Sequence, residues 1–272
     1  MLTLRYHGTT TVPIEAECLR PDKLAGLSTA QVEKIEVQHG NTRVALAEFF
    51  TVAGDSSDSR LRIEGDCGRV KLIGAKMESG SIEVEGAVGM HLGAEMRGGD
   101  ITVHGDAGDW VGAEMHGGRI HVHGRAGHLV GAGYRGARRG MRGGVILIDG
   151  EVGNEIGSVM RRGLIAVGGP AGDFVGASMI AGTILLFGDV GIRTGAGMKR
   201  GTVGLFGKAK PALLPTFKYA CLYRPSFLSL YLAALRQWGF RFEDASANIL
   251  VARYCGDLVS LGKGEILCRP AL

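Results

Sequence analysis

The chain has 272 residues and a formal net charge of +4, and it contains 46 glycines but only 7 prolines. Glycine at this level without a Gly-X-Y triplet period excludes a collagen triple helix. The near balance of 31 basic and 27 acidic residues, with only 6% aromatic residues, argues against a dedicated nucleic-acid binder. No run of eighteen apolar residues is present, so we expect no membrane span.

The cysteines favour free thiols in a reducing compartment. They are odd in number, widely spaced and form no Cys-x-x-Cys pair: Cys18, Cys67, Cys221, Cys255 and Cys268. This spacing argues against disulfides and against a thiolate zinc site. The N-terminal residues also lack the apolar core of a secretory signal. We therefore expect a cytoplasmic protein.

Residues 1–60 are predicted to form a small N-terminal cap. The expected elements are short strands at residues 2–4 and 12–14, a helix that begins at the capping box of Ser28–Gln31, a hairpin over residues 35–46 and a polar linker over residues 55–59. A cap with polar edges protects the first unit of a stacked-coil protein, which would otherwise expose an unpaired strand edge.

Residues 61–207 repeat one glycine-rich phrase. The first glycine of each copy lies at Gly65, Gly86, Gly105, Gly124, Gly150, Gly169, Gly188 and Gly207. Five of the seven intervals are 19 residues, one is 21, and one is 26 because of an insertion after Gly131. A repeat of this period indicates stacked units that each bury one face against the next.

Within the repeat, apolar residues form columns. The positions four and two residues before each anchor glycine are apolar in every copy, as in Ile120 and Val122. A second column contains Ile73, Leu92, Val111, Val130, Ile156 and Val175, with Thr194 as the exception. A third consists of Met77, Met96, Met115, Met141, Met160, Met179 and Met198, which we interpret as a stacked core ladder.

These columns predict an all-β fold, a right-handed parallel β-helix with roughly triangular coils. The alternation of β-branched residues with period two is typical of strands with one buried face. Glycines at the corners can adopt positive φ angles and allow close approach between coils. A phosphate-binding role for the glycines is rejected, because no copy has the strand, turn, helix and acidic residue that such a site needs.

Outward positions of the same strands differ between copies. His104 and His123 occupy equivalent positions and should stack, with His121 beside them. One interpretation is a metal site, since imidazoles ligate zinc and iron. We expect no carboxylate in a clear ligand position, however, and therefore favour a surface or interface ladder. Farther along, Leu185, Phe187 and Phe206 make the face apolar, so the C-terminal tail or another subunit should cover it.

A second outward edge is basic. The candidate contacts for a partner or an anionic chain are Arg97, Arg135, Arg138, Arg139, Arg142, Arg161, Arg162 and Arg200, with His116 and Lys199 beside them. One interpretation is a solvated edge that prevents strand pairing between molecules. The other is a ridge that meets an acidic partner or chain, where charge steers the encounter.

Residues 208–272 break the repeat and are predicted to form a C-terminal extension with one helix. Phe227, Tyr231, Leu235 and Trp238 lie at helical spacing within residues 226–238. This helix is the expected cover of the apolar face. Residues 249–251 and 265–267 return to strand character and are expected to pair near the end of the chain.

The tandem coils and the segment Leu214–Phe217 resemble the C subunit of the formylmethanofuran dehydrogenase family. The coil itself is similar to the glycine-rich C-terminal β-helix of the glutamate synthase large subunit. The composition and the extension from Phe227 to Gly264 look most like the bacterial relative, the formyltransferase/hydrolase complex of methylotrophs.

That resemblance implies a non-catalytic scaffold subunit. The complex would transfer a formyl group from formyl-tetrahydromethanopterin to a methanofuran-type carrier and hydrolyse it to formate, in one-carbon (formaldehyde) oxidation. The resemblance places both reactions in partner subunits, a metallohydrolase and a formyltransferase, and implies no cofactor bound directly and no nucleic-acid or membrane partner. The alternatives are the C subunit of a formylmethanofuran dehydrogenase, a structural module of a glutamate-synthase-like amidotransferase, and a stand-alone enzyme built around the histidine patch.

Overall fold

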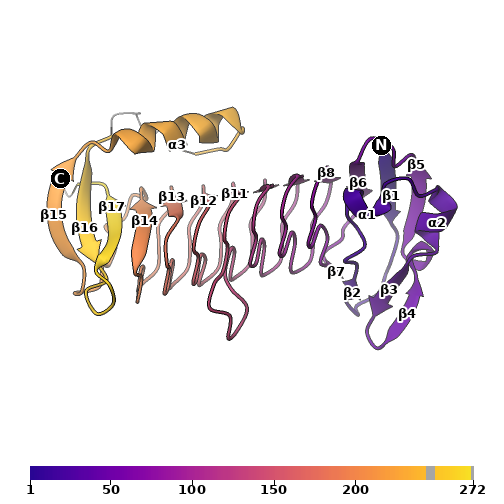
Figure 1. The fold of residues 1–272 in the computed structure, drawn as a ribbon, viewed down its shortest axis with the longest axis horizontal. Coiled ribbons are helices and arrows are strands. Elements are labelled where there is room, and N and C mark those ends of the chain that lie inside the picture. Colours follow the sequence, from indigo (N-terminus) through magenta and orange to yellow (C-terminus); the bar gives the residue numbers. More distant parts are fainter. Residues whose placement is uncertain (243–248, 271–272) are drawn as a thin grey trace.

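The computed structural model describes residues 1–242 and 249–270 and shows a parallel β-helix drawn out along one axis (Figure 1). Its small helices are α1 (Pro21–Leu24), α2 (Thr29–Glu33) and the 3-10 helix η1 (Leu46–Glu48), and its one long helix is α3 (Ser226–Gln237). The strands are β1 (Leu2–Tyr6), β2 (Ile14–Glu15), β3 (Glu36–His39), β4 (Thr42–Ala45), β5 (Phe50–Gly54), β6 (Arg60–Glu64), β7 (Val70–Lys71), β8 (Ser81–Val84), β9 (Asp100–Val103), β10 (Arg119–Val122), β11 (Val145–Ile148), β12 (Leu164–Val167), β13 (Thr183–Leu186), β14 (Arg200–Leu205), β15 (Lys218–Tyr223), β16 (Val251–Gly256) and β17 (Lys263–Cys268).

One 13-stranded sheet runs the length of the molecule, in the order β15-β16-β17-β14-β13-β12-β11-β10-β9-β8-β6-β1-β5. Strands β6 and β8 to β14 pair in parallel and in register, so that Ile120 lies between Ile101 and Ile146. The strand β7 instead pairs with β2 in a second sheet of the order β4-β3-β2-β7. A second line of parallel bridges joins the residues two positions after the anchor glycines, from Cys67 to Val190. Equivalent residues of successive coils are therefore stacked on one another.

All three predicted columns are buried, which confirms the core. The strand column and the methionine column are at most 4% exposed, and Thr194 is as buried as the apolar residues whose place it takes. The residues at the parallel bridges form a fourth, small-residue column that the repeat analysis did not identify.

As predicted, glycines in the turns of the coils adopt positive φ, as at Gly93 (60°) and Gly99 (87°). Non-glycine residues of most coils also do so, as at His91 (65°) and Glu95 (56°). The left-handed region costs such residues about 1 to 2 kcal/mol each. Their backbone amides donate to the next coil, His91 to Asp109 at 2.9 Å and Glu95 to Ala113 at 2.8 Å, and these bonds stabilise the corners.

The N-terminal region contains the predicted capping box of Ser28 and Gln31 and the predicted hairpin, β3 and β4. The strand β1 pairs in parallel with β6 and adds one layer to the stack, and β5 then pairs with β1 in the antiparallel direction. The strand β5 was not predicted. The reversal of direction at β5 ends the parallel stack at the N-terminal side.

The C-terminal region confirms the helix and its role. α3 lies along the coils of β11 to β14 (Figure 1), and Leu228, Leu232 and Leu235 pack with Leu185, Phe187 and Phe206 in a second core. The expected strand pair is β16 and β17, but β17 also pairs in parallel with β14 and thereby extends the stack. The exposed edge strand β15 was not predicted. The division at residues 60 and 207 stays a prediction, since the sheet passes through both boundaries.

None of the helices in the described part of the chain has the length and hydrophobicity needed to cross a bilayer. All five cysteines are free.

Replacing Gly131 with alanine should destabilise the β-helix by about 2 to 4 kcal/mol. Gly131 has a φ of 66°, and a Cβ atom there would lie 2.6 Å from Cδ1 of Ile165 in the core. Gly136→Ala is the matched control, because its φ is 84° but no atom lies within 4 Å of the added Cβ. Urea unfolding of both variants measures the difference. Equal losses of stability would contradict a packing role for Gly131.

Replacing Leu232 with alanine should lower the free energy of unfolding by about 2 to 5 kcal/mol, because the side chain is fully buried between α3 and the coils. Leu230 lies on the same helix but is 73% exposed. Leu230→Ala should therefore change the free energy of unfolding by less than about 0.5 kcal/mol. Denaturant titration followed by circular dichroism tests this. Similar values for the two variants would show that α3 is not packed as described.

Candidate functional site

The first candidate site is a groove of about 880 Å³ between one edge of the coils and α3. We call it the basic groove. Its charged and aromatic lining consists of Arg139, Arg161, Arg162, Lys199, Arg200, Tyr231 and Trp238. Leu164, Thr183 and Ile180 contribute to the remainder of the lining.

The repeat itself places these cations. Arg161 follows the buried Met160, and Lys199 follows the buried Met198 at the equivalent corner two coils later. Because the methionine points into the core, the residues after it project outward at this corner. The aromatic wall comes from α3, where the hydroxyl of Tyr231 lies 3.2 Å from Oγ1 of Thr183. The basic groove thus combines two segments that are far apart in the sequence.

The predicted basic edge is only partly gathered in this groove. Arg139, Arg161, Arg162 and Arg200 line it, together with Lys199. Arg97 instead pairs with Glu78 at 3.3 Å, and Arg142 lies 3.8 Å from Glu114 and 3.3 Å from His116. Arg135 and Arg138 are exposed on the insertion outside the groove.

The five groove cations have no acidic partner among the residues that the structure describes. Like charges gathered on one wall produce a local positive potential, which is strongest at low ionic strength. The groove therefore suits an anionic or acidic chain, and its tyrosine and tryptophan offer apolar contact along the same path.

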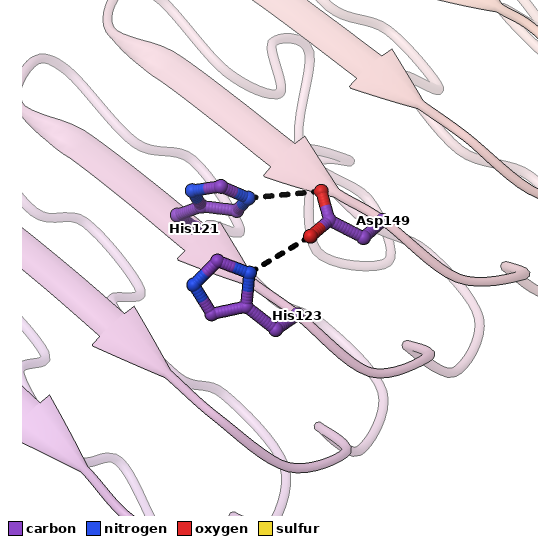
Figure 2. Close-up of side chains that lie close together, drawn as sticks. All are labelled: His121, His123 and Asp149. Carbon is purple, nitrogen blue, oxygen red and sulfur yellow. Dashed lines mark hydrogen bonds and ion pairs between the residues drawn. The ribbon is translucent and has the colours of Figure 1, made fainter. Parts of the chain in front are cut away.

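The second candidate site is the histidine–aspartate cluster, formed by His121, His123 and Asp149 (Figure 2). Nε2 of His121 lies 2.9 Å from Oδ1 of Asp149, and Nδ1 of His123 lies 2.8 Å from Oδ2. The two imidazole rings, 4.1 Å apart, share the outward side of one strand because alternate residues point the same way. Asp149 follows the next strand, β11.

The carboxylate of Asp149 is almost fully enclosed. The side chains of Asp149 and His121 are only 7% and 8% exposed, whereas that of His123 is 28% exposed. Burial by itself would raise the pKa of Asp149, but the hydrogen bonds to His121 and His123 outweigh it and hold the pKa below its usual value. The backbone amide of Arg241 donates a further, longer bond of 3.4 Å.

This cluster corrects the expectation that no carboxylate stands in a ligand position. Asp149 precedes Gly150 as His123 precedes Gly124, so the two residues belong to one column. The anchor glycines Gly124 and Gly150 already align Asp149 with His123 in the sequence. What the sequence did not show is that the carboxylate of Asp149 lies within hydrogen-bond distance of both imidazoles of the preceding coil.

His104 lies one coil earlier and forms a related group. As predicted, its ring stacks on that of His123, with centroids 5.3 Å apart and an interplanar angle of 17°. Its Nε2 lies 3.2 Å from Glu83, and Glu85 is within the same group of possible ligands. This second group is more open to solvent than the histidine–aspartate cluster, since the side chain of His104 is 39% exposed.

The coil architecture defines the class of protein. The family model described as the GXGXG motif matches residues 67–213, which is more than half of the chain. The chain belongs to this family of glycine-rich β-helix proteins, and the resemblance drawn from its sequence is confirmed.

Particular relatives are the C subunits of formylmethanofuran dehydrogenases. In the molybdenum-containing enzyme of Methanothermobacter marburgensis this polypeptide is 46% identical over 82 residues, covering 30% of this chain and 20% of the relative. Its counterpart in Methanosarcina barkeri is 40% identical over 85 residues, which cover 30% of this chain and 28% of that relative. The matches thus span about a fifth to a third of these relatives.

A solved structure matches over nearly the whole length. It is a chain in the crystal structure of the formyltransferase/hydrolase complex (FhcABCD) from Methylorubrum extorquens in complex with methylofuran. The TM-score is 0.89 and the identity 36%, and the match covers 99% of this chain and 100% of that chain. The similarity therefore includes both terminal regions as well as the coils.

Proposed function

We propose that this chain is a non-catalytic scaffold subunit of a formyltransferase/hydrolase complex. The complex would take the formyl group of formyl-tetrahydromethanopterin to a methanofuran-type carrier and release it as formate. The observation that carries the proposal is the full-length match, at 36% identity, to a chain of such a complex. Formyl transfer and hydrolysis are assigned to partner subunits, a formyltransferase and a metallohydrolase, in the cytoplasm.

The same observation favours this proposal over a formylmethanofuran dehydrogenase. The matches to dehydrogenase subunits cover about a third of this chain, whereas the match to the chain of the complex covers 99% of it. The full-length match also includes the capping strands and the helical extension. A role within the dehydrogenase is the second candidate.

The fold suits a scaffold because it is held by a continuous ladder of backbone bonds. Each coil pairs with the coils before and after it, and the core columns are at most a few per cent exposed. Such a sheet cannot bend locally without breaking several bonds at once. A rigid rod would keep catalytic partners at a fixed separation while a carrier moves between them.

The family resemblance implies a carrier with an acidic polyglutamate tail, and we further propose that the basic groove contacts this tail. A methanofuran-type carrier with a polyglutamate tail would present one carboxylate per residue, and the groove presents five cations. Exposed charge pairs contribute about 0.2 to 1 kcal/mol each, so several together are needed for useful affinity. Their main effect would be to steer and retain a mobile chain.

Tagging the full-length chain in its native source and identifying the proteins that co-purify tests the scaffold proposal. A formyltransferase and a metallohydrolase in fixed stoichiometry are expected, with formyl-group release from formyl-tetrahydromethanopterin in the isolated assembly. Co-purification of a molybdenum or tungsten dehydrogenase would favour the second candidate. Isolation of the chain as an active monomer would overturn both.

Reversing three charges of the groove, in R161E/R162E/R200E, should weaken the binding of poly-L-glutamate by about tenfold or more at low salt. The effect should shrink at about 0.5 M salt, where charges are screened within a few ångströms. Fluorescence anisotropy of labelled poly-L-glutamate measures both values.

The matched control is R43E/R97E/R125E, which makes the same change in net charge outside the groove. These arginines pair with Glu36, Glu78 and Asp106, at 3.7, 3.3 and 3.0 Å. An equal loss of poly-L-glutamate binding in the control would show that the effect comes from net charge and not from the groove. Unchanged binding in the groove variant would remove the carrier contact from the proposal and leave the scaffold role intact.

A further inference from the structure

The histidine–aspartate cluster has no part in the proposed function, and its polarity is not required by the fold. In the following coils, the position of His121 is taken by Leu147, Ala166 and Leu185. Those residues are fully buried and pack beneath the C-terminal region. The stack therefore accommodates apolar side chains here, whereas burying a carboxylate costs free energy unless it is compensated.

The compensation of Asp149 comes from a small set of groups. Two imidazole nitrogens and the amide of Arg241 contact its oxygens, and no lysine or arginine side chain of the described residues pairs with it. A metal ion held between the nitrogens and the carboxylate would add a positive charge beside Asp149.

The strands hold the three side chains in place before any ligand arrives. β10 and β11 pair in register, with His121 opposite Leu147 and Val122 opposite Ile148. The ring of His121 also lies 6.3 Å from that of Phe240, which closes one side of the cluster. His123 is the most exposed of the three and leaves the other side open to solvent.

We propose that His121, His123 and Asp149 form a binding site for one divalent transition-metal ion of the zinc type. Two nitrogens and one carboxylate are a ligand set that suits zinc and its neighbours. A fourth position would face solvent beside His123, as at zinc sites that keep an exchangeable ligand. The inference does not depend on the proposed function.

The distances in the cluster are close to those that a metal ion needs. Two ligands about 2.1 Å from one ion lie about 3.0 to 3.4 Å apart for angles between about 90° and 110°. The nitrogen–oxygen separations here are 2.9 and 2.8 Å. Each nitrogen–oxygen pair would open by a few tenths of an ångström on binding, and the ligand atoms of the three residues already lie within 4.8 Å of one another.

Equilibrium dialysis of the chelator-treated, full-length chain against Zn²⁺, with bound metal counted by mass spectrometry, tests the site. One equivalent is expected to bind, and the midpoint of thermal unfolding should rise with Zn²⁺ because the ion binds the folded state. D149N and H123Q should each weaken binding by at least about a hundredfold and abolish the thermal shift.

Two histidine variants outside the cluster serve as controls. H104Q removes the neighbouring ligand candidate, and H116Q removes an exposed histidine on the basic edge. Both should retain one equivalent of Zn²⁺. Circular dichroism without metal shows whether D149N is folded. If D149N is not folded, Zn²⁺ binding by H123Q tests the site. Failure of the unaltered chain to bind Zn²⁺, or unchanged binding in H123Q, would overturn the proposal.

Discussion

The register of the parallel backbone hydrogen bonds between coils is the constraint on which the rest of the structure depends. Because the strands β6 and β8 to β14 pair residue for residue with their neighbours, a side chain meets its own equivalent one coil away. Columns of isoleucine, valine and methionine then fill the core continuously. A shift of one residue would turn every apolar side chain outward, so the core and the register enforce each other.

Because the coils are in register, the outward residues that differ between copies lie side by side on one surface. Along the outward side of one face, glutamate and histidine give way to aspartate and then to glycine and phenylalanine, in the order Glu85, His104, His123, Asp149, Gly168, Phe187 and Phe206. The apolar end lies under the C-terminal region, and the polar end contains the histidine–aspartate cluster. One column thereby provides both apolar side chains that pack beneath the C-terminal region and, beside them, two of the three residues of the histidine–aspartate cluster.

Both candidate sites lie where the coils meet the C-terminal extension. The basic groove depends on both the coil corners and α3, since Tyr231 and Trp238 complete the wall that the arginines begin. The histidine–aspartate cluster lies against Phe240, just beyond the end of the same helix. The C-terminal extension is thus part of both candidate sites. The similarity to a chain of the formyltransferase/hydrolase complex includes this extension, because it covers 99% of the chain.

The sequence alone determined the parallel β-helix, its buried columns and the stacking of His104 on His123, because these follow from a local repeat. It also determined α3, because the apolar residues there lie at helical spacing. It did not reveal that β17 would join the stack beside β14, since that pairing links segments about sixty residues apart. Nor did it show which arginines are already paired or that Asp149 meets two histidines across the insertion. Those outcomes depend on side-chain distances between coils, which only the packed tertiary structure sets.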